Sequence, residues 1–188
     1  FKPGTQYQYC NMNFILVSYI IEKLSGLSFD LYLNTKVIGV MGLNNTYCDL
    51  WDGQFGDNPY RVDEYFLIQN EDNLLDNLGI GWCAPYASMG MSSGSGCVIS
   101  NNIDMNLWYT NLFNNSNGYI PKVFKYKETR DMLLYPWTLT NELNNGSIKE
   151  YYAQGIIVQY NVSDYSYPSL IYYDGATFCS HTAMKMIP

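Results

Sequence analysis

Residues 90–94 read Gly-Met-Ser-Ser-Gly, a spacing that can present a nucleophilic serine on a sharp turn. Asp174 and His181 follow in an order in which an acid and a histidine can activate such a serine for attack on a carbonyl carbon. That turn needs a strand before it and a helix after it, whereas Pro85 precedes this one and Ser-Gly-Ser-Gly follows it. The context favours a flexible or tightly turned loop, and an esterase-type attack by Ser92 stays a minor alternative.

The single histidine offers a second kind of chemistry. His181 lies two residues after Cys179 in a strand-like segment, so the two side chains share a face and could form a Cys–His dyad. A histidine satisfied by its strand neighbours is the more ordinary interpretation. With one histidine and no C-x-x-C spacing, we expect neither a structural zinc site nor a bound cofactor.

Residues 9–11, Tyr-Cys-Asn, stand directly before an apolar helical pattern. Taken alone they indicate a tyrosine that packs at a helix start and an asparagine that caps the helix. The many tyrosines of residues 151–173 could form a stacking surface for sugars, but tyrosine is also a good strand former with one hydrated edge.

The totals exclude several classes of protein. The 188 residues suffice for one domain with a core, and the formal charge of −7, with only 10 Lys and Arg, argues against a nucleic-acid partner. No apolar run reaches the roughly 20 residues needed to span a bilayer. Sequons at Asn44, Asn114, Asn145 and Asn161 favour secretion, although 20 asparagines produce two or three sequons by chance.

The order of elements predicts an α+β fold. Apolar spacing and glycine stops predict helices over 13–25 and 28–37, and Ser100 can cap a third helix that ends before residue 114. A fourth helix is expected over 122–134, and 47–97 reads as irregular, with a short helix around 72–78. From residue 150 onward short β-rich segments alternate with turns, which predicts antiparallel strands over about 152–160, 169–173 and 178–187. We expect these side chains to be buried between helices: Phe14, Val17, Ile21, Leu24, Ile103, Leu107 and Leu112.

Three ordered segments resemble the serine β-lactamase and penicillin-binding-protein family, particularly its class C-like and esterase-like branch. Residues 3–46, PGTQYQYCNMNFILVSYIIEKLSGLSFDLYLNTKVIGVMGLNNT, are similar to the family's Pro-Gly-Thr, Tyr-Ser-Asn, apolar helix and PLGM..T turn. Residues 94–113, GSGCVISNNIDMNLWYTNLF, look like its GG..ST..D...W segment. Residues 151–160 and 171–188 look like its closing strands, with Tyr-Asp-Gly-Ala at 173–176 in the place of its Lys-Thr-Gly or His-x-Gly motif.

This resemblance implies a β-lactamase/transpeptidase-like fold, in which a helical subdomain joins an antiparallel sheet flanked by helices. The chain would be one partial domain over 1–188, mostly helix and loop through 149 and sheet strands over 150–188. The activity implied is acyl transfer on an amide, ester or β-lactam, with a small molecule or peptide as substrate. By resemblance Tyr9 is the acid/base, Asn11 positions its partners, Tyr173 and Gly175 form the strand wall, and the Ala176 N–H is an oxyanion donor.

Two departures weaken the expected activity. No serine in the 188 residues has a lysine three positions later, so the family's Ser-x-x-Lys nucleophile motif is missing, and the chain reads as if it begins in mid-domain and stops before the family's last strand and helix. Tyr173 replaces the usual Lys or His, and no nearby cation is then left to lower the pKa of Tyr9. We therefore expect this chain alone to be inactive, and a non-catalytic binding or interaction module is the alternative function.

Overall fold

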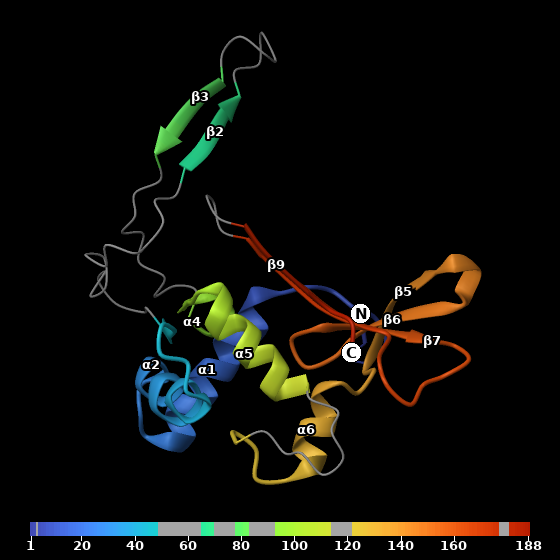
Figure 1. The fold of residues 1–188 in the computed structure, drawn as a ribbon, viewed down its shortest axis with the longest axis horizontal. Coiled ribbons are helices and arrows are strands. Elements are labelled where there is room, and N and C mark those ends of the chain that lie inside the picture. Colours follow the sequence, from blue (N-terminus) through green and yellow to red (C-terminus); the bar gives the residue numbers. More distant parts are fainter. Residues whose placement is uncertain (3, 49–64, 70–77, 83–92, 114–121, 177–180) are drawn as a thin grey trace.

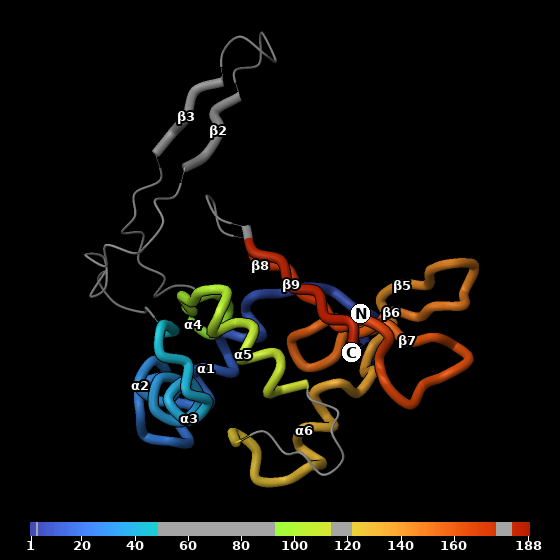
Figure 2. The backbone as a smooth tube through the Cα atoms, viewed as in Figure 1, coloured from blue at the N-terminus to red at the C-terminus, as the bar shows by residue number. Residues whose placement is uncertain are grey.

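The computed structural model describes residues 1–2, 4–48, 65–69, 78–82, 93–113, 122–176 and 181–188. Helices gather on one side of the molecule and a five-stranded antiparallel sheet lies on the other (Figure 1). The predicted α+β class is confirmed, as is the antiparallel pairing of the C-terminal strands. The extended N-terminal segment passes from the sheet side to the helices, as the smooth trace shows (Figure 2).

Helices dominate the first part of the described chain. They are α1 (Asn11–Ser25), α2 (Phe29–Leu33), the π-helical η1 (Asn34–Ile38), α3 (Gly39–Met41), α4 (Ser93–Gly96), α5 (Asn102–Phe113) and α6 (Lys127–Leu133). Gly26 ends α1 in the left-handed conformation, with its N–H donating to the Glu22 carbonyl oxygen. The Glu22 carboxylate then accepts the backbone N–H of Phe29, so one side chain links the end of α1 to the start of α2. The fourth helix begins at Lys127 rather than at the predicted residue 122, because Tyr126 is still extended.

Strands occur earlier and are shorter than the sequence predicted. The main sheet has the order β5 (Thr138–Leu143), β6 (Ile148–Tyr152), β7 (Ile157–Asn161), β8 (Leu170–Ala176) and β9 (His181–Met186). The single strand expected over 152–160 is wrong, because Gly155 adopts φ +82 and turns the chain back between β6 and β7. The sheet also begins before residue 150, since β5 pairs with β6.

Residues 47–97 are not wholly irregular, which corrects the prediction. β1 (Tyr47–Cys48) pairs with β4 (Val98–Ile99), and β2 (Tyr65–Gln69) pairs with β3 (Leu78–Trp82), both antiparallel. The helix expected around 72–78 falls almost entirely outside the described residues, and its last residue, Leu78, starts β3.

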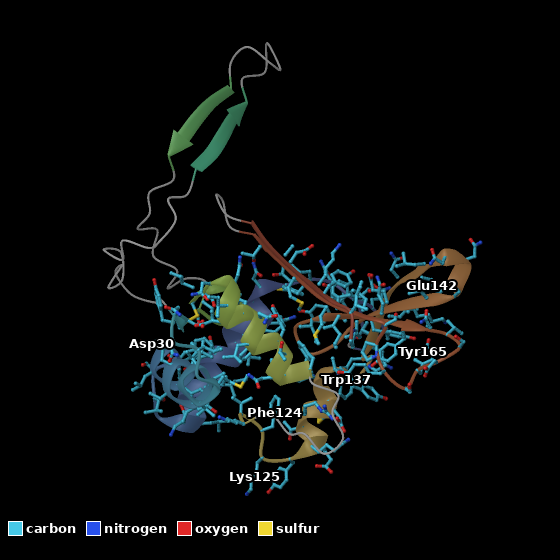
Figure 3. The ribbon with its side chains drawn as sticks, in the orientation of Figure 1. Asp30, Phe124, Lys125, Trp137, Glu142 and Tyr165 are labelled. Atoms are coloured by element: carbon cyan, nitrogen blue, oxygen red, sulfur yellow. A yellow bond between two sulfur atoms is a disulfide. The ribbon has the colours of Figure 1, made fainter. Side chains whose placement is uncertain are left out.

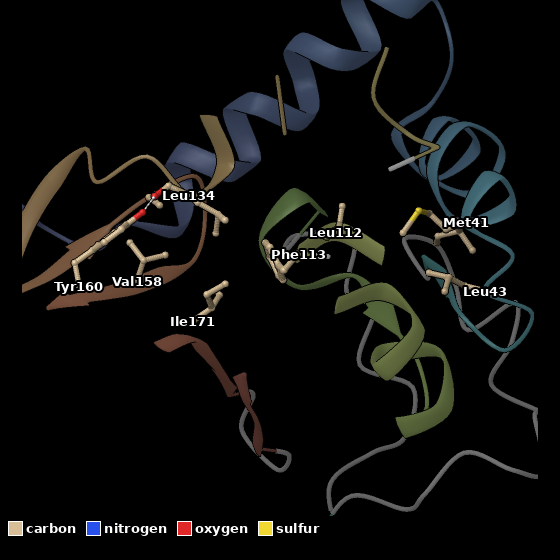
Figure 4. Packing of buried hydrophobic residues seen from close by; sticks show 10 residues of the cluster. Met41, Leu43, Leu112, Phe113, Leu134, Val158, Tyr160 and Ile171 are labelled. Atoms are coloured by element: carbon tan, nitrogen blue, oxygen red, sulfur yellow. Dashed lines mark hydrogen bonds between the residues drawn. The ribbon is translucent and has the colours of Figure 1, made fainter. Parts of the chain in front are cut away.

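The core lies between the helices and the sheet. Met41, Leu112 and Phe113 from the helical side belong to one buried cluster with Val158 and Ile171 of the sheet, and the last two are completely buried (Figure 4). The sheet contributes them from neighbouring positions, because Val158 of β7 pairs with Ile171 of β8. One contiguous cluster therefore joins the two parts of the described chain.

The predicted set of buried helix residues is mostly wrong. Only Leu112 is buried, Phe14 and Ile21 are half-buried, and the other four are exposed: Val17, Leu24, Ile103 and Leu107. The residue of α1 that is buried is Ser18, whose hydroxyl contacts that of Ser93 in α4. The apolar spacing gave the correct helix but the wrong packed face, because a small polar side chain lets α4 approach α1 closely.

Two kinds of bond hold residues 45–48 to the segment that begins α5. The buried Asp104 carboxylate accepts the Asn45 N–H at 2.7 Å and the Thr46 hydroxyl at 2.8 Å, and the Thr46 hydroxyl also bonds Ser100. A disulfide joins Cys48 to Cys97. The part of the sequence that resembles the family's PLGM..T turn is thus fixed to the part that resembles its ST..D segment.

Polar and charged side chains are concentrated on the surface. Glu142 lies at the far end of the β5–β6 hairpin, away from the helices, where the Lys149 ammonium approaches it to 3.2 Å (Figure 3). None of the helices within the described residues combines the length and apolar character that crossing a membrane would require.

Gly94 tests the close approach of α4 to α1. A Cβ at this position would lie 2.3 Å from the Phe14 carbonyl oxygen, so we expect Gly94→Ala to lower the free energy of unfolding by about 1–3 kcal/mol. Gly39→Ala is the matched control, because Gly39 is helical and its added Cβ would meet only the Asn34 carbonyl oxygen, at 3.1 Å. In Gly39→Ala the higher helix propensity of alanine and the tight contact should nearly cancel, so the free energy of unfolding should change by less than about 1 kcal/mol. Urea denaturation followed by circular dichroism measures both, and equal effects would contradict the proposed contact.

Candidate functional site

Tyr9 and Asn11 lie together where α1 begins. Cys10, the residue between them, is extended and precedes the first turn of the helix. The Tyr9 hydroxyl donates a hydrogen bond of 2.5 Å to the Asn11 side-chain oxygen, and both residues are exposed. Asn11 therefore holds the phenol of Tyr9 across the start of the helix, rather than capping the helix with its side chain.

The N-terminal segment also brings Tyr7 to the sheet. The ring of Tyr7 lies against the ring of Tyr152, with 4.9 Å between the ring centroids. Tyr152 ends β6, and Tyr173 stands in β8. We call Tyr7, Tyr9, Tyr152 and Tyr173 the tyrosine cluster.

Burial favours the neutral forms of Tyr152 and Tyr173, and the pKa of each also responds to hydroxyls of the cluster. Burial is the main cause that raises the pKa of Tyr173 above the ordinary value of 10.0, and the hydroxyls of Tyr9 and Tyr152 raise it further. Burial likewise raises the pKa of Tyr152, with added contributions from Tyr7 and Tyr9 and a partial offset from Tyr173. The interaction places Tyr9 beside Tyr173, although the two are at opposite ends of the sequence.

Gly175 occupies a position in β8 where a side chain would crowd the neighbouring strand. It pairs with Thr182 of β9, and a Cβ on Gly175 would lie 2.9 Å from the Thr182 hydroxyl oxygen. That hydroxyl in turn donates to the Gly175 carbonyl oxygen at 3.4 Å. Ala176 follows as the last residue of β8, paired with His181.

A cavity of about 680 Å³ opens beside the strand end that carries Tyr173 and Gly175. Its other walls come from α5, from the residues before α5 and from β9. Tyr9 and Asn11 are not among its lining residues. Tyr173 therefore links the two features, because it interacts with Tyr9 and also lines the cavity together with Gly175. The sequence had indicated Tyr173 and Gly175 but none of the α5 residues that face them.

Tyr7 and Tyr152 were the residues of the cluster that sequence reasoning missed. A signal was present in residues 6–9, Gln-Tyr-Gln-Tyr, because alternate positions of an extended chain share one side. For Tyr152 the sequence offered no such signal, since its place depends on the turn at Gly155.

The rival sites do not gain support. The five-stranded sheet is antiparallel, so the esterase-type alternative with Ser92 is wrong as an α/β-hydrolase, because the α/β-hydrolase fold is built on a mostly parallel sheet. Ser92 and Cys179 lie outside the described residues, whereas Ser93 belongs to the short helix α4 and bonds Ser18. Within the described ranges no three His, Cys, Asp or Glu side chains gather as a metal ion would require.

The contact between Tyr9 and Tyr173 can be tested by titration. We expect Tyr9→Phe to lower the pKa of Tyr173, because the Tyr9 hydroxyl raises it, while burial keeps the value above 10.0. In tyrosine labelled with ¹³C at Cζ, the Tyr173 signal should start to titrate at a lower pH in the variant than in the wild type. Tyr19→Phe is the control, because Tyr19 is exposed on α1 and contacts Lys23 instead. An unchanged Tyr173 titration in Tyr9→Phe would show that the two hydroxyls do not meet in solution.

Known structures share this fold. The penicillin-binding protein homologue from Pyrococcus abyssi, described as octameric, has a TM-score of 0.68 and 20% identity, covering 100% of this chain and 37% of its own. The penicillin binding protein from Bacillus halodurans has a TM-score of 0.65 and 19% identity over 97% of this chain and 49% of its own. A D-stereospecific amidohydrolase from Streptomyces sp. has a TM-score of 0.57 and 16% identity over 95% of this chain and 48% of its own. The chain thus spans half or less of the length of these similar proteins.

The family is shown by sequence. A comparison with curated protein sequences gives no match. The family model described as Beta-lactamase, however, matches residues 1–185, which include the tyrosine cluster and every residue that lines the cavity except Met186. The fold is that of the β-lactamases and transpeptidases, and the chain belongs to the beta-lactamase family.

Proposed function

We propose that this chain supplies the acid/base and strand side of an acyl-transfer site in a beta-lactamase-related serine hydrolase. The observation that carries the proposal is the contact of Tyr9, held by Asn11 at the start of α1, with Tyr173 of β8. The segment that begins α1 meets the strand of Tyr173, and Tyr173 and Gly175 in turn line a cavity, which supports a site for one carbonyl group.

Each residue would have a defined task in the reaction. A serine hydroxyl attacks the substrate carbonyl carbon, its proton passes to a base, and the carbonyl oxygen becomes an oxyanion. Tyr9 would transfer that proton, first from the nucleophile and then to the leaving group. The strand of Tyr173 and Gly175 would lie along the substrate, and the Ala176 N–H would donate to the oxyanion.

The substrate class follows from this chemistry and from the similar proteins. An amide, an ester or a β-lactam each presents a carbonyl to such a site, and the bearer would be a small molecule or a peptide. The D-stereospecific amidohydrolase among the similar structures supports an amide, but its 16% identity establishes the fold alone. The proposal therefore includes all three kinds of carbonyl substrate.

A second candidate function is a non-catalytic module that keeps the pocket for binding. The neutral cluster favours it, because Tyr173 stands where the family's motif has a cation and its own pKa is raised by burial. A tyrosine of ordinary pKa is ionised to roughly one part in a thousand at pH 7, so a relay tyrosine depends on nearby cations. The Tyr9 hydroxyl here donates its hydrogen bond to the Asn11 side-chain oxygen.

Residues 1–188 should be expressed beside a version extended upstream in the same reading frame. Both would be assayed with a chromogenic β-lactam and a p-nitrophenyl ester, and probed with a serine-reactive fluorophosphonate. We expect no labelling of the 188 residues, because no serine has a lysine three positions later. We expect the extended chain to be labelled, and the label to be lost when the serine of an upstream Ser-x-x-Lys is changed to alanine.

The role of Tyr9 is tested in the extended chain. Tyr9→Phe should lower kcat/KM by about 10²- to 10⁴-fold, the usual contribution of a positioned acid/base. The control Tyr19→Phe, on the helix that follows Tyr9, should leave kcat/KM unchanged, because Tyr19 contacts Lys23. A folded extended chain that neither labels nor turns over would favour the binding module, and stoichiometric labelling of the 188 residues lost on Ser92→Ala would contradict the proposed nucleophile.

A further inference from the structure

One carboxylate joins side chains from four neighbouring strands of the sheet. The carboxylate of Glu150 in β6 accepts a hydrogen bond of 2.6 Å from the Tyr172 hydroxyl of β8 and one of 2.9 Å from the Gln159 side-chain amide of β7. The Thr140 hydroxyl of β5 lies 3.1 Å from the same carboxylate. We call Thr140, Glu150, Gln159 and Tyr172 the Glu150 network.

The Glu150 network and Tyr173 lie on opposite faces of the sheet. Val158 of β7 pairs with Ile171 of β8, and both side chains are completely buried in the core. Gln159 and Tyr172, the next residue along each strand, therefore point to the other face. Tyr173, one position further, returns to the face of Ile171. The network thus holds β8 from behind the face that carries the candidate site.

β8 loses its neighbour β7 at the point where the candidate site begins. The pairing of β7 with β8 consists of three residue pairs and ends at Ile157–Tyr172. Within the described residues, the segment 173–176 pairs with β9 alone. β8 and β9 therefore extend together beyond the rest of the sheet as a two-stranded ribbon (Figure 2). Such a ribbon can tilt about its root, and the bond from Tyr172 to Glu150 acts at that root.

The bond between Tyr172 and Glu150 crosses a whole strand. β7 lies between β6 and β8, so the two side chains bridge two strand spacings, about 10 Å in all. A hydroxyl that donates to a carboxylate forms a shorter and stronger bond than one between neutral groups. Burial raises the pKa of Tyr172, and the bond to Glu150 raises it further, so the hydroxyl keeps its proton and remains the donor.

A β-bulge directs a further side chain to the carboxylate. The pairing of β5 with β6 shifts register between Leu139 and Asn141, so Thr140 has no residue opposite it. Its hydroxyl instead lies 3.1 Å from both the backbone carbonyl oxygen and the carboxylate of Glu150. Bulges often re-aim a side chain in this way. Strands on both sides of β6 therefore hold the carboxylate, which makes it a fixed anchor for Tyr172.

From this geometry we infer that Glu150 is a positioning residue for the proposed acyl-transfer site, because its carboxylate fixes Tyr172 and, through Tyr172, the segment 173–176 of β8. The anchor keeps Tyr173 where it meets Tyr9. A displacement of about 1 Å in a catalytic group can cost about 100-fold in rate. The catalytic consequence rests on the proposed function, whereas the position of residues 173–176 can be measured without turnover.

NMR of the isotope-labelled 188-residue chain tests the anchor. Tyr172→Phe keeps the ring and removes the bond to Glu150, so the amide signals of 173–176 and the Cζ signal of Tyr173 should shift. Hydrogen exchange at the amides of 173–176 should become faster by about fivefold or more, because the ribbon opens more often. Glu150→Ala should act alike, and the double variant should add little, because both changes remove one bond. Glu150→Gln, which keeps an acceptor oxygen, should have a smaller effect.

Tyr167→Phe is the matched control. The Tyr167 hydroxyl donates a bond of 2.8 Å to the Phe113 carbonyl oxygen, so this variant also loses one hydrogen bond made by a tyrosine. Thermal unfolding followed by circular dichroism should show comparable losses of stability in Tyr167→Phe and Tyr172→Phe, while only Tyr172→Phe changes residues 173–176. Equal changes at 173–176 in both variants, or no change there in Tyr172→Phe, would overturn the inference.

Kinetics of the extended chain tests the consequence for the site. Tyr172→Phe should lower kcat by about 10- to 100-fold and leave KM within about twofold, because the displaced groups act in the transition state. Tyr167→Phe should change neither constant. An unchanged kcat in Tyr172→Phe would show that Glu150 does not position the site. An extended chain without any turnover would contradict the proposed function instead, and the NMR comparison would still decide whether Glu150 fixes residues 173–176.

Discussion

The buried carboxylate of Asp104 is the interaction on which the arrangement of the helices depends. A buried charge is tolerated only when hydrogen bonds replace its water, and here the Asn45 N–H and the Thr46 hydroxyl do so. Asp104 also stands in the first turn of α5, where the helix dipole favours a negative charge. The carboxylate keeps its hydrogen bonds only if residues 45 and 46 stay beside α5. It therefore fixes the segment that follows α1, α2 and α3 against α5, which forms a wall of the cavity.

The neighbouring disulfide acts on the same joint through chain entropy. Cys48 and Cys97 are separated by 49 positions, and closing a loop of that size stabilises a fold by about 4 kcal/mol in the chain-entropy account. The hydrogen bonds of Asp104 set the geometry, and the disulfide limits how far the two segments separate when the chain unfolds. Together they keep α5 in place opposite β8 and β9, where the cavity lies.

Electrostatics gives the candidate site its particular character. Burial raises the pKa of Tyr173 and of Tyr152; the hydroxyls of Tyr9 and Tyr152 raise the pKa of Tyr173 further, whereas the Tyr173 hydroxyl partly offsets the rise at Tyr152. The site therefore gathers neutral phenols where proton transfer is usually assisted by a cation. Below the ordinary tyrosine pKa these groups are neutral hydrogen-bonding groups, which suits binding of a carbonyl and makes any proton transfer by Tyr9 depend on charges supplied by other groups.

The sequence by itself determined the elements that are encoded locally. The apolar spacing and Gly26 predicted α1, the turn-separated β-rich segments predicted antiparallel strands, and three ordered segments indicated the family and Tyr9, Asn11, Tyr173 and Gly175. Caps, glycine stops and strand alternation act within a few residues, so a single sequence contains them.

Tertiary structure alone decided which surfaces meet. Ser18 rather than Leu24 is buried in α1, because Gly94 of α4 has no Cβ and permits close approach. The pairing of Cys48 with Cys97, and the position of Tyr152 beside Tyr7, likewise depend on segments brought together from distant parts of the chain. The face of a helix that becomes buried depends on the shape of the element packed against it. That shape exists only in the folded chain and is not contained in any local sequence pattern.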